Sequence, residues 1–315
     1  MPPPLNVTAI VLSFNEAIHI ERCIARIAPH VKRVVVIDSH STDDTAARAR
    51  ARGAEVLCNT FVNQSQQFNW ALDNLTIDTG WILRLDSDEL LDDQALNWLH
   101  ANLATRPDPT AGLEFRLKVI FKGKHLRHGG YYSTDLLRLW RTGRGRIEER
   151  WMDERTVVDG QIEKVPGNLI DENLNSIGWW TEKHNRYASR HVIDFILLQH
   201  SPEHRRSSGG ERLEPRARFK RFLRNRVYAR FPLFLRPALY WLYRYFALLG
   251  FLDGKRGLIW HFLHGFWYYM LIDVKVWEAE QIVARGGLPA FAEHYRCKYG
   301  LSILLPNDEL AAPNA

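Results

Sequence analysis

The stretch Leu83-Arg84-Leu85-Asp86-Ser87-Asp88-Glu89 decides how the rest of the chain is interpreted. It belongs to an apolar run that begins at Trp81, and it precedes a helix-like segment, 92–105. This order predicts a buried strand that ends in two carboxylates, and ligands bind outside such strand ends in open α/β sheets. Carboxylates suit a hard divalent cation, which usually keeps phosphate oxygens as further ligands. We therefore expect Asp88, helped by Asp86, to hold a metal that holds a nucleotide diphosphate. The alternative is an acidic turn that caps the next helix.

The composition is that of a folded protein. The chain has 315 residues, of which 46% are hydrophobic and 25% charged, enough for one large or two ordinary domains. Its cysteines, Cys23, Cys58 and Cys297, are odd in number and far apart, so they predict neither a disulfide framework nor a zinc site and fit a reducing compartment. We expect no signal peptide at the N-terminus. No apolar run reaches the roughly 18 residues of a spanning helix.

Strands and helices alternate through the first 105 residues or so. The pattern predicts four strands with helices between them, the first of them near-continuously apolar as in a sheet buried on both faces, and this favours a doubly wound α/β sheet. The expected strands are 7–14, 34–38, 55–59 and 81–85, and the expected helices are 18–28, 45–52, 64–75 and 92–105.

Polar residues follow three of these strands: Asn15 and Glu16, then Asp38, then the Asp86 and Asp88 pair. Helix capping is the alternative at each position, but three such groups at one sheet edge favour a ligand site. The usual nucleotide fingerprints, G-x-G-x-x-G after the first strand and G-x-x-x-x-G-K-[ST], are missing. A dehydrogenase or P-loop protein is therefore not supported.

The segments Ser13-Phe14-Asn15-Glu16, Ile37 to Thr45 and Leu85 to Glu89 resemble the three motifs of family-2 glycosyltransferases in order, spacing and position after strands. The resemblance covers about residues 5 to 155 and extends to bacterial lipopolysaccharide-core and exopolysaccharide enzymes. It implies a GT-A-type, mostly parallel sheet and transfer of a sugar from a nucleotide diphosphate donor with inversion at the anomeric carbon.

The resemblance also implies roles for individual residues. Asn15 and Glu16 would bind the nucleotide-sugar near its ribose and base, and Asp38 would accept a hydrogen bond from the base, preferably uracil. Asp43 is a further candidate for nucleotide contact, which an N-cap role would explain equally well. Gln67 and Asn69 are weaker candidates. Asp86 and Asp88 would form the DXD pair, with Asp88 on Mg²⁺ or Mn²⁺ and Asp86 on the sugar or the metal.

An inverting transfer needs a carboxylate that takes the proton of the acceptor hydroxyl. In the family this base comes from an acidic motif downstream of the DXD pair, and Trp151-Met152-Asp153-Glu154 is similar in kind and position. If this backbone is extended, the two acids point opposite ways. We prefer Asp153 as the catalytic base and keep Glu154 as the alternative. Strands predicted at 112–122 and 135–141 would form the floor of the acceptor side.

The C-terminal part is basic and aromatic. Between Arg205 and Arg256 fourteen Lys or Arg stand against three acidic residues, a local charge of +11, which leaves about −5 for the remainder. The aromatic-rich runs 240–246 and 258–272 are typical of helices that lie in a membrane interface. A buried helical hairpin is the alternative. We expect residues 207–210 to form a linker and residues 306–315 to be disordered.

The sequence thus predicts a GT-A domain at residues 1–205, with a nucleotide-sugar half (about 1–110) and an acceptor half (111–205). A membrane-apposed α-helical region would follow at 206–305. The acceptor would be lipid-linked or another glycan, and the protein would bind an anionic membrane surface at the cytoplasmic face of a bacterial inner membrane, peripherally or monotopically. Nucleic acid is not expected as a partner. A sugar-phosphate nucleotidyltransferase, or a non-catalytic lipid or nucleic-acid binder, would be the alternative.

Overall fold

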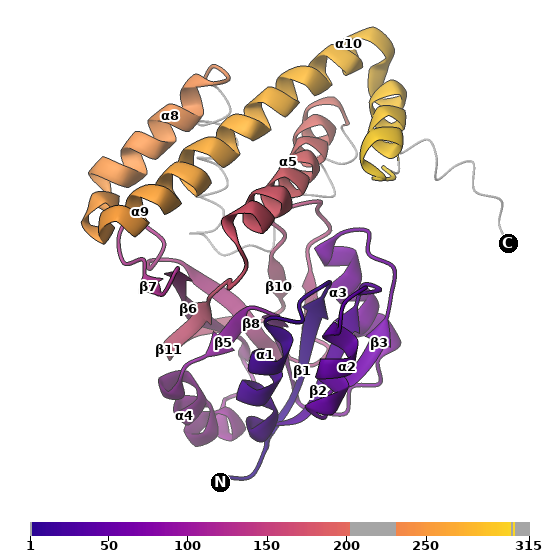
Figure 1. Ribbon diagram of the computed structural model, residues 1–315. Helices are drawn as coiled ribbons and strands as arrows, with labels where there is room; N and C mark the ends of the chain where they lie inside the picture. The colour runs from indigo at the N-terminus through magenta and orange to yellow at the C-terminus, as the bar shows by residue number, and fades with distance from the viewer. Residues whose placement is uncertain (1, 202–230, 304, 306–315) are drawn as a thin grey trace, which may run out of the picture. The chain divides into compact units, whose positions relative to one another are not determined.

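The computed structural model describes residues 2–201, 231–303 and 305 (Figure 1). The chain forms two units, each described by itself. The first comprises Met1–Glu148, Arg155–Ser176 and Arg244–Trp260, and the second Glu149–Glu154, Ile177–Tyr243 and His261–Ala315. The expected linker at 207–210, most of the basic block and the tail 306–315 lie outside the described residues. The domain division drawn from the sequence stays a prediction.

The N-terminal half of the first unit has the predicted alternation of strands and helices. Its four strands are parallel and lie in the order β3-β2-β1-β4. The elements are β1 (Leu5–Ser13), α1 (Ile20–Ile27), β2 (Val31–Asp38), α2 (Thr45–Ala51), β3 (Glu55–Cys58), α3 (Gln64–Asn74) and β4 (Trp81–Asp86). A 3-10 turn, η1 (Ala28–His30), leads into β2.

Apolar side chains cover both faces of this sheet. Along β1, Val7, Ala9 and Val11 are buried in a core that includes α1, whereas Ile10 between them is buried in a second core with Phe68 of α3. Successive side chains of a strand point to opposite faces, so a strand covered on both sides is apolar at every position. This is why the continuous apolar runs predicted a doubly wound sheet correctly.

The sheet continues with strands of mixed direction. The full order is β3-β2-β1-β4-β8-β6-β11-β5, with β7 paired to β6 and β9 paired to β10 in a small separate sheet. These elements are β5 (Glu89–Leu91), α4 (Asp93–Asn102), η2 (Leu103–Thr105), β6 (Thr110–Phe121), β7 (Lys124–His125), β8 (Asp135–Arg141), β9 (Gly145–Ile147), β10 (Thr156–Val158) and β11 (Gln161–Asp171). The mixed α/β class with a parallel-dominated N-terminal half agrees with the expected GT-A-type sheet.

Sequence analysis found β6 and β8 but not β5, β7, β9, β10 or β11. Three of these strands have only three residues, too few to show a period of two. The eleven residues of β11 contain Pro166 and Gly167, and its pairing with β6 shifts register between Lys164 and Asn168. Pro and Gly inside a strand usually mark a bulge, which conceals the alternating pattern.

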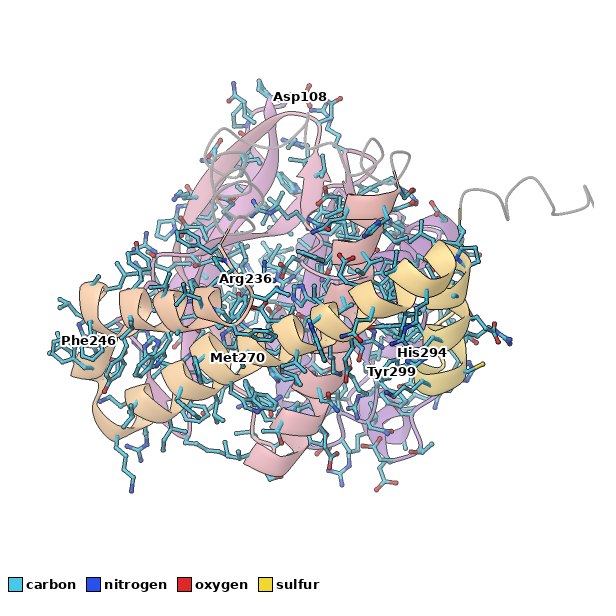
Figure 2. All side chains as sticks on the ribbon, turned by 90° about the horizontal axis from the view of Figure 1, so that it is seen from above. Asp108, Arg236, Phe246, Met270, His294 and Tyr299 are labelled. Atoms are coloured by element: carbon cyan, nitrogen blue, oxygen red, sulfur yellow. The ribbon has the colours of Figure 1, made fainter. Side chains whose placement is uncertain are left out.

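The second unit consists of helices. Its main elements are α5 (Ile177–His200), α8 (Leu235–Leu242), the π-helical turn η7 (His261–Trp267) and α10 (Tyr268–Tyr299), which bends at Gly287. A second π-helical turn, η5 (Tyr243–Ala247), begins at Tyr243, the last residue of the stretch Ile177–Tyr243, and continues into the first unit. Figure 2 shows α8 beside the first part of α10, with Arg236 and Met270 labelled. The buried Arg236 guanidinium donates to Asp273 Oδ1 from Nε at 2.8 Å. Among the described helices, none combines the length and the apolar character that crossing a membrane requires.

Candidate active site

The carboxyl ends of three adjacent strands carry the predicted acidic groups. In the register of the sheet, Ser13 of β1 lies opposite Asp38 of β2, and Leu12 of β1 lies opposite Asp86 of β4. The Ser13 hydroxyl donates to Asp38 Oδ1 at 2.9 Å, and the Ser87 hydroxyl donates to the carbonyl oxygen of Leu12, also at 2.9 Å. The structure therefore brings the polar loops after β1, β2 and β4 to one edge of the sheet.

The loop after β1 is shaped by Asn15, which has a left-handed backbone (φ 54°) and accepts from Thr42 N at 2.8 Å. It presents Glu16, whose carboxylate is mostly buried and lies 2.5 Å from His19 Nδ1. His19 Nε2 accepts a hydrogen bond from Leu174 N at 2.8 Å, so the ring proton must be on Nδ1. His19 thus donates to Glu16 as a neutral imidazole and fixes the direction of its carboxylate.

Asp38 is buried at the end of β2 and accepts three hydrogen bonds from protein groups. Besides Ser13, Ser41 donates to it from its backbone N at 2.8 Å and from its hydroxyl at 2.6 Å. Asp43 accepts from Ala17 N and from the backbone and side chain of Thr45, so it joins the loops after β1 and β2. Burial raises the pKa of Asp43, but these hydrogen bonds outweigh it and lower that pKa overall.

Gln67 and Asn69 lie on α3 and are both buried. The Gln67 amide donates to Ser39 Oγ and to Asn59 O, each at 3.1 Å, beside the loop that follows β2. Asn69 instead exchanges two hydrogen bonds with the backbone of Ile147, at 2.8 and 3.0 Å. Gln67 therefore borders the candidate site and Asn69 holds β9. Their contact with a nucleotide, like that of Asp43, stays a prediction.

Asp86 is the last residue of β4, and Asp88 lies on the short turn between β4 and β5. Asp88 Oδ2 accepts from Asn173 Nδ2 at 3.0 Å, and Asp86 Oδ2 faces Arg138 Nη2 at 3.2 Å. The same Arg138 nitrogen donates to the buried Glu89, whose other oxygen accepts from Asp86 N at 3.0 Å. Burial raises the pKa of Glu89 to about 7, although Arg138 opposes this. Glu89 and Arg138 together fix the backbone and side chain of Asp86.

A divalent cation fits this turn. Mg²⁺ is usually bound by one or two carboxylates together with phosphate oxygens and water, rather than by a cage of protein ligands. Asp86 and Asp88 supply two half-buried carboxylates on one turn. Across the described parts of the chain, no group of three or more His, Cys, Asp or Glu is arranged to hold a metal. A cation here would therefore take its remaining ligands from the donor diphosphate and water.

The predicted base lies in the second unit, in the segment Glu149–Glu154. This segment is irregular and Asp153 has a left-handed backbone (φ 55°), so the assumption of an extended backbone was wrong. Asp194 of α5 is buried and accepts from Trp151 N at 3.1 Å and Met152 N at 3.2 Å. The Asp153 carboxylate is partly exposed and lies 3.9 Å from His191 Nε2. The choice between Asp153 and Glu154 as base stays a prediction.

His184, also on α5, is half-buried against Trp180, with ring centroids 3.4 Å apart and Nδ1 donating to the Trp180 carbonyl at 2.8 Å. Burial lowers the pKa of His184 to about 4, although the Trp180 carbonyl raises it. The imidazole is therefore neutral at physiological pH.

Sequence reasoning missed four residues that orient the predicted groups: His19, Glu89, Arg138 and Asp194. Two of them carried a recognisable signal. Arg138 interrupts the apolar strand 136–140, and Asp194 interrupts the apolar run 192–197. A charge within an apolar element is rarely buried without a partner, so each could have been predicted to hold an opposite charge or a backbone donor.

A sheet that gathers acidic side chains at the carboxyl ends of three adjacent parallel strands, without a glycine-rich phosphate loop after β1, has the arrangement expected of a GT-A-type glycosyltransferase domain. Comparison with known families agrees with this class. Residues 8–127 match the family described as glycosyl transferase family 2. This part of the chain is a glycosyl transferase family 2 domain.

Bacterial proteins named as glycosyltransferases are similar to this chain. The chain is 37% identical over 86 residues to an uncharacterized glycosyltransferase of Rickettsia felis, covering 27% of this chain and 30% of that relative. It is 24% identical over 196 residues to the lipopolysaccharide core biosynthesis glycosyltransferase LpsC of Rhizobium meliloti, covering 60% of this chain and 71% of LpsC. The chain thus spans less than a third of the length of the Rickettsia felis relative.

Among solved structures, the chain is similar to glucosyl-3-phosphoglycerate synthase of Mycobacterium tuberculosis, crystallised with Mn²⁺, UDP and glucosyl-3-phosphoglycerate. The identity is 25%, the match covers 37% of this chain and 44% of that one, and the TM-score is 0.29.

Proposed function

We propose that the protein transfers a sugar, with inversion, from a nucleoside diphosphate donor to a lipid-linked or lipopolysaccharide-type acceptor. The observation that carries this proposal is the convergence of Glu16, Asp38 and the Asp86–Asp88 turn at one sheet edge. Asp38 and Glu16 would receive the base and ribose, with uracil as the preferred base. Asp86 and Asp88 would receive the diphosphate through a divalent cation.

The chain's own residues have defined tasks in this reaction. Asp153 takes the proton of the acceptor hydroxyl, the acceptor oxygen forms a bond to the anomeric carbon, and the bond to the diphosphate oxygen breaks with its electron pair leaving on the diphosphate. A carboxylate can accept this proton when it lies within hydrogen-bond reach of the acceptor hydroxyl. A bound Mg²⁺ or Mn²⁺ would supply neutralisation of the charge on the departing diphosphate.

A membrane-bound acceptor accounts for two features of the C-terminal part. The basic block lies between residues 205 and 256, and an anionic leaflet attracts each Lys or Arg near its surface by about 1 kcal/mol. Large exposed apolar side chains are frequent on α8, where Leu235, Leu239 and Leu242 are each at least 40% exposed. The similarity to LpsC, a lipopolysaccharide core enzyme by name, supports the same acceptor class. We therefore place the protein on the cytoplasmic face of a bacterial inner membrane, bound peripherally or monotopically.

The test is a transfer assay on the full chain. UDP-, GDP- and dTDP-sugars are each incubated with Mn²⁺ and either a bacterial lipid extract or a soluble glycan, and release of nucleoside diphosphate and glycosylated product is measured by mass spectrometry. We expect release and product with one UDP-sugar and the lipid acceptor. Transfer to the soluble glycan alone, by protein that does not bind lipid vesicles, would contradict the proposed membrane-bound acceptor and membrane attachment. If no donor gives a glycosylated product, the proposed glycosyltransferase activity is wrong.

A further inference from the structure

The segment Arg244–Trp260 belongs to the sheet-bearing first unit although it lies far along the chain from the sheet. It contains the end of η5, a 3-10 turn, η6 (Gly250–Asp253), and the short helix α9 (Gly254–Trp260). Figure 1 shows α9 next to β7. The segment exposes six large apolar side chains, with exposed fractions between 37% and 53%: Phe246, Leu249, Phe251, Leu252, Leu258 and Ile259.

The inner side of the segment is held by buried charged groups to the loop that follows β7. Arg244 is buried, donates from Nε to the Gly129 carbonyl at 2.6 Å, and stacks its guanidinium 3.7 Å from the centre of the Tyr131 ring. Asp253 is buried and accepts from His128 N at 2.9 Å and His128 Nδ1 at 3.0 Å.

Aromatic packing and main-chain hydrogen bonds complete this attachment. The Trp260 ring lies 5.1 Å from that of Phe121 and 5.6 Å from that of Tyr131, between ring centres. Gly129 N donates to the carbonyl of Leu248 at 2.8 Å. The segment is thus fixed on its inner side, so its exposed apolar side chains are not the result of a loose attachment.

The exposed charges of the segment are all positive. Lys255 and Arg256 are exposed, whereas its one acidic residue, Asp253, is buried. Lys122, in the turn between β6 and β7, and Arg127, in the loop after β7, are exposed as well. A short segment that exposes six large apolar side chains and two basic ones is complementary to an anionic bilayer, where apolar groups enter the interface and Lys and Arg bind headgroup phosphates.

We propose that the segment Arg244–Trp260 is the membrane-inserting element of the sheet-bearing unit. Its six exposed apolar side chains enter an anionic lipid surface, and Lys255 and Arg256 bind the phosphates of that surface. Arg244 and Asp253 are positioning residues that fix this surface to the loop that follows β7. That the partner is a lipid surface rests on the proposed function. The new element is the part of the chain that enters this surface.

The test is co-sedimentation of the full chain with vesicles, without donor or acceptor. Vesicles of phosphatidylethanolamine with 30% phosphatidylglycerol are compared with phosphatidylcholine vesicles. The variant Phe246→Ser/Leu252→Ser should lower the partition coefficient on anionic vesicles at least tenfold. Lys255→Glu/Arg256→Glu should abolish the preference for anionic over neutral vesicles. Val62→Ser, which removes an exposed apolar side chain elsewhere in the same unit, should bind as the wild type does.

Unchanged vesicle binding by Phe246→Ser/Leu252→Ser would overturn the proposal. So would a wild-type dimer, seen by light scattering without vesicles, that this variant converts to a monomer, because a second copy would then be the occupant of the surface. Circular dichroism and thermal unfolding verify that the variants are folded. Nucleotide binding is measured separately. If it is absent while the vesicle results hold, the proposed function fails and the membrane-inserting element stands.

Discussion

Asp194 offers a sharp test of how the predicted base is held. Its carboxylate accepts from the backbone N–H groups of Trp151 and Met152, and its Oδ2 lies 3.2 Å from Arg150 Nη2, with both charged side chains at most 6% exposed. These contacts fix the backbone that leads directly to Asp153. Replacing Asp194 should therefore change both the stability of the second unit and the position of the base.

The size of the effect follows from burial. Breaking a buried ion pair by removing one partner costs about 3–5 kcal/mol, because the remaining charge stays out of water. Asp194→Ala should cost roughly 3 kcal/mol or more. Asp194→Asn keeps one acceptor oxygen for the two N–H groups and loses only the charge, so we expect about 1–3 kcal/mol. The second unit is intermediate in size between small and large domains, so 1 kcal/mol corresponds to about 4 °C in Tm.

The assay is thermal and urea unfolding of the full chain, followed by transfer kinetics at a temperature where all variants are folded. The control is Glu280→Gln, which removes a half-exposed partner of His200 in the same unit and should cost less than about 1 kcal/mol. We expect Asp194→Asn to lower kcat while leaving donor affinity unchanged. The reasoning would be refuted if Asp194→Asn had the same Tm and urea midpoint as Glu280→Gln and transferred sugar at the wild-type rate.

Three further predictions concern single residues. Asp153→Asn should bind the donor normally and lose transfer by at least 100-fold, whereas Glu154→Gln should retain it; the opposite pattern in single-turnover kinetics would assign the base to Glu154. His19→Ala should weaken donor binding severalfold, because Glu16 loses the imidazole that orients it, and isothermal titration measures this; unchanged affinity would remove Glu16 from the donor site. Unfolded His184 takes up a proton near pH 6.5 but folded His184 only near pH 4, so the free energy of unfolding should fall by up to roughly 3 kcal/mol as the pH is lowered from 6.5 to 4. His184→Gln should make the free energy of unfolding less dependent on pH over this range. Parallel curves of unfolding free energy against pH for wild type and variant would contradict this.

The parallel part of the fold could be predicted from the sequence because each of its strands carries a local signal. Val7 to Val11 are apolar at nearly every position, as burial on both faces requires, and Gly53, with φ of 83°, ends α2 where expected. The antiparallel additions are less visible, since β5 and β9 are three residues long and Pro166 interrupts β11. Their partners are set by contacts distant in sequence.

The acidic groups of the site were predictable for the same reason, because parallel neighbouring strands end at one edge. The groups that orient them were not. His19 reaches Leu174 across 155 positions of sequence, and Arg138 reaches Glu89 across 49. Nothing local marks such pairs. The Asp153 backbone also differs from the prediction, since a left-handed conformation at a non-glycine residue depends on the surrounding fold.

The most direct test of the central claim is calorimetric titration of UDP into the full chain with Mn²⁺, with Mg²⁺, and after removal of divalent ions by EDTA. If Asp88 and Asp86 hold a cation that holds the diphosphate, the wild type should bind UDP at least tenfold more tightly with metal than without it. Asp88→Asn should lose that gain, and Asp78→Asn, which alters an exposed acid of the same unit, should keep it. Equal UDP affinity with and without metal, or full metal dependence in Asp88→Asn, would contradict the account.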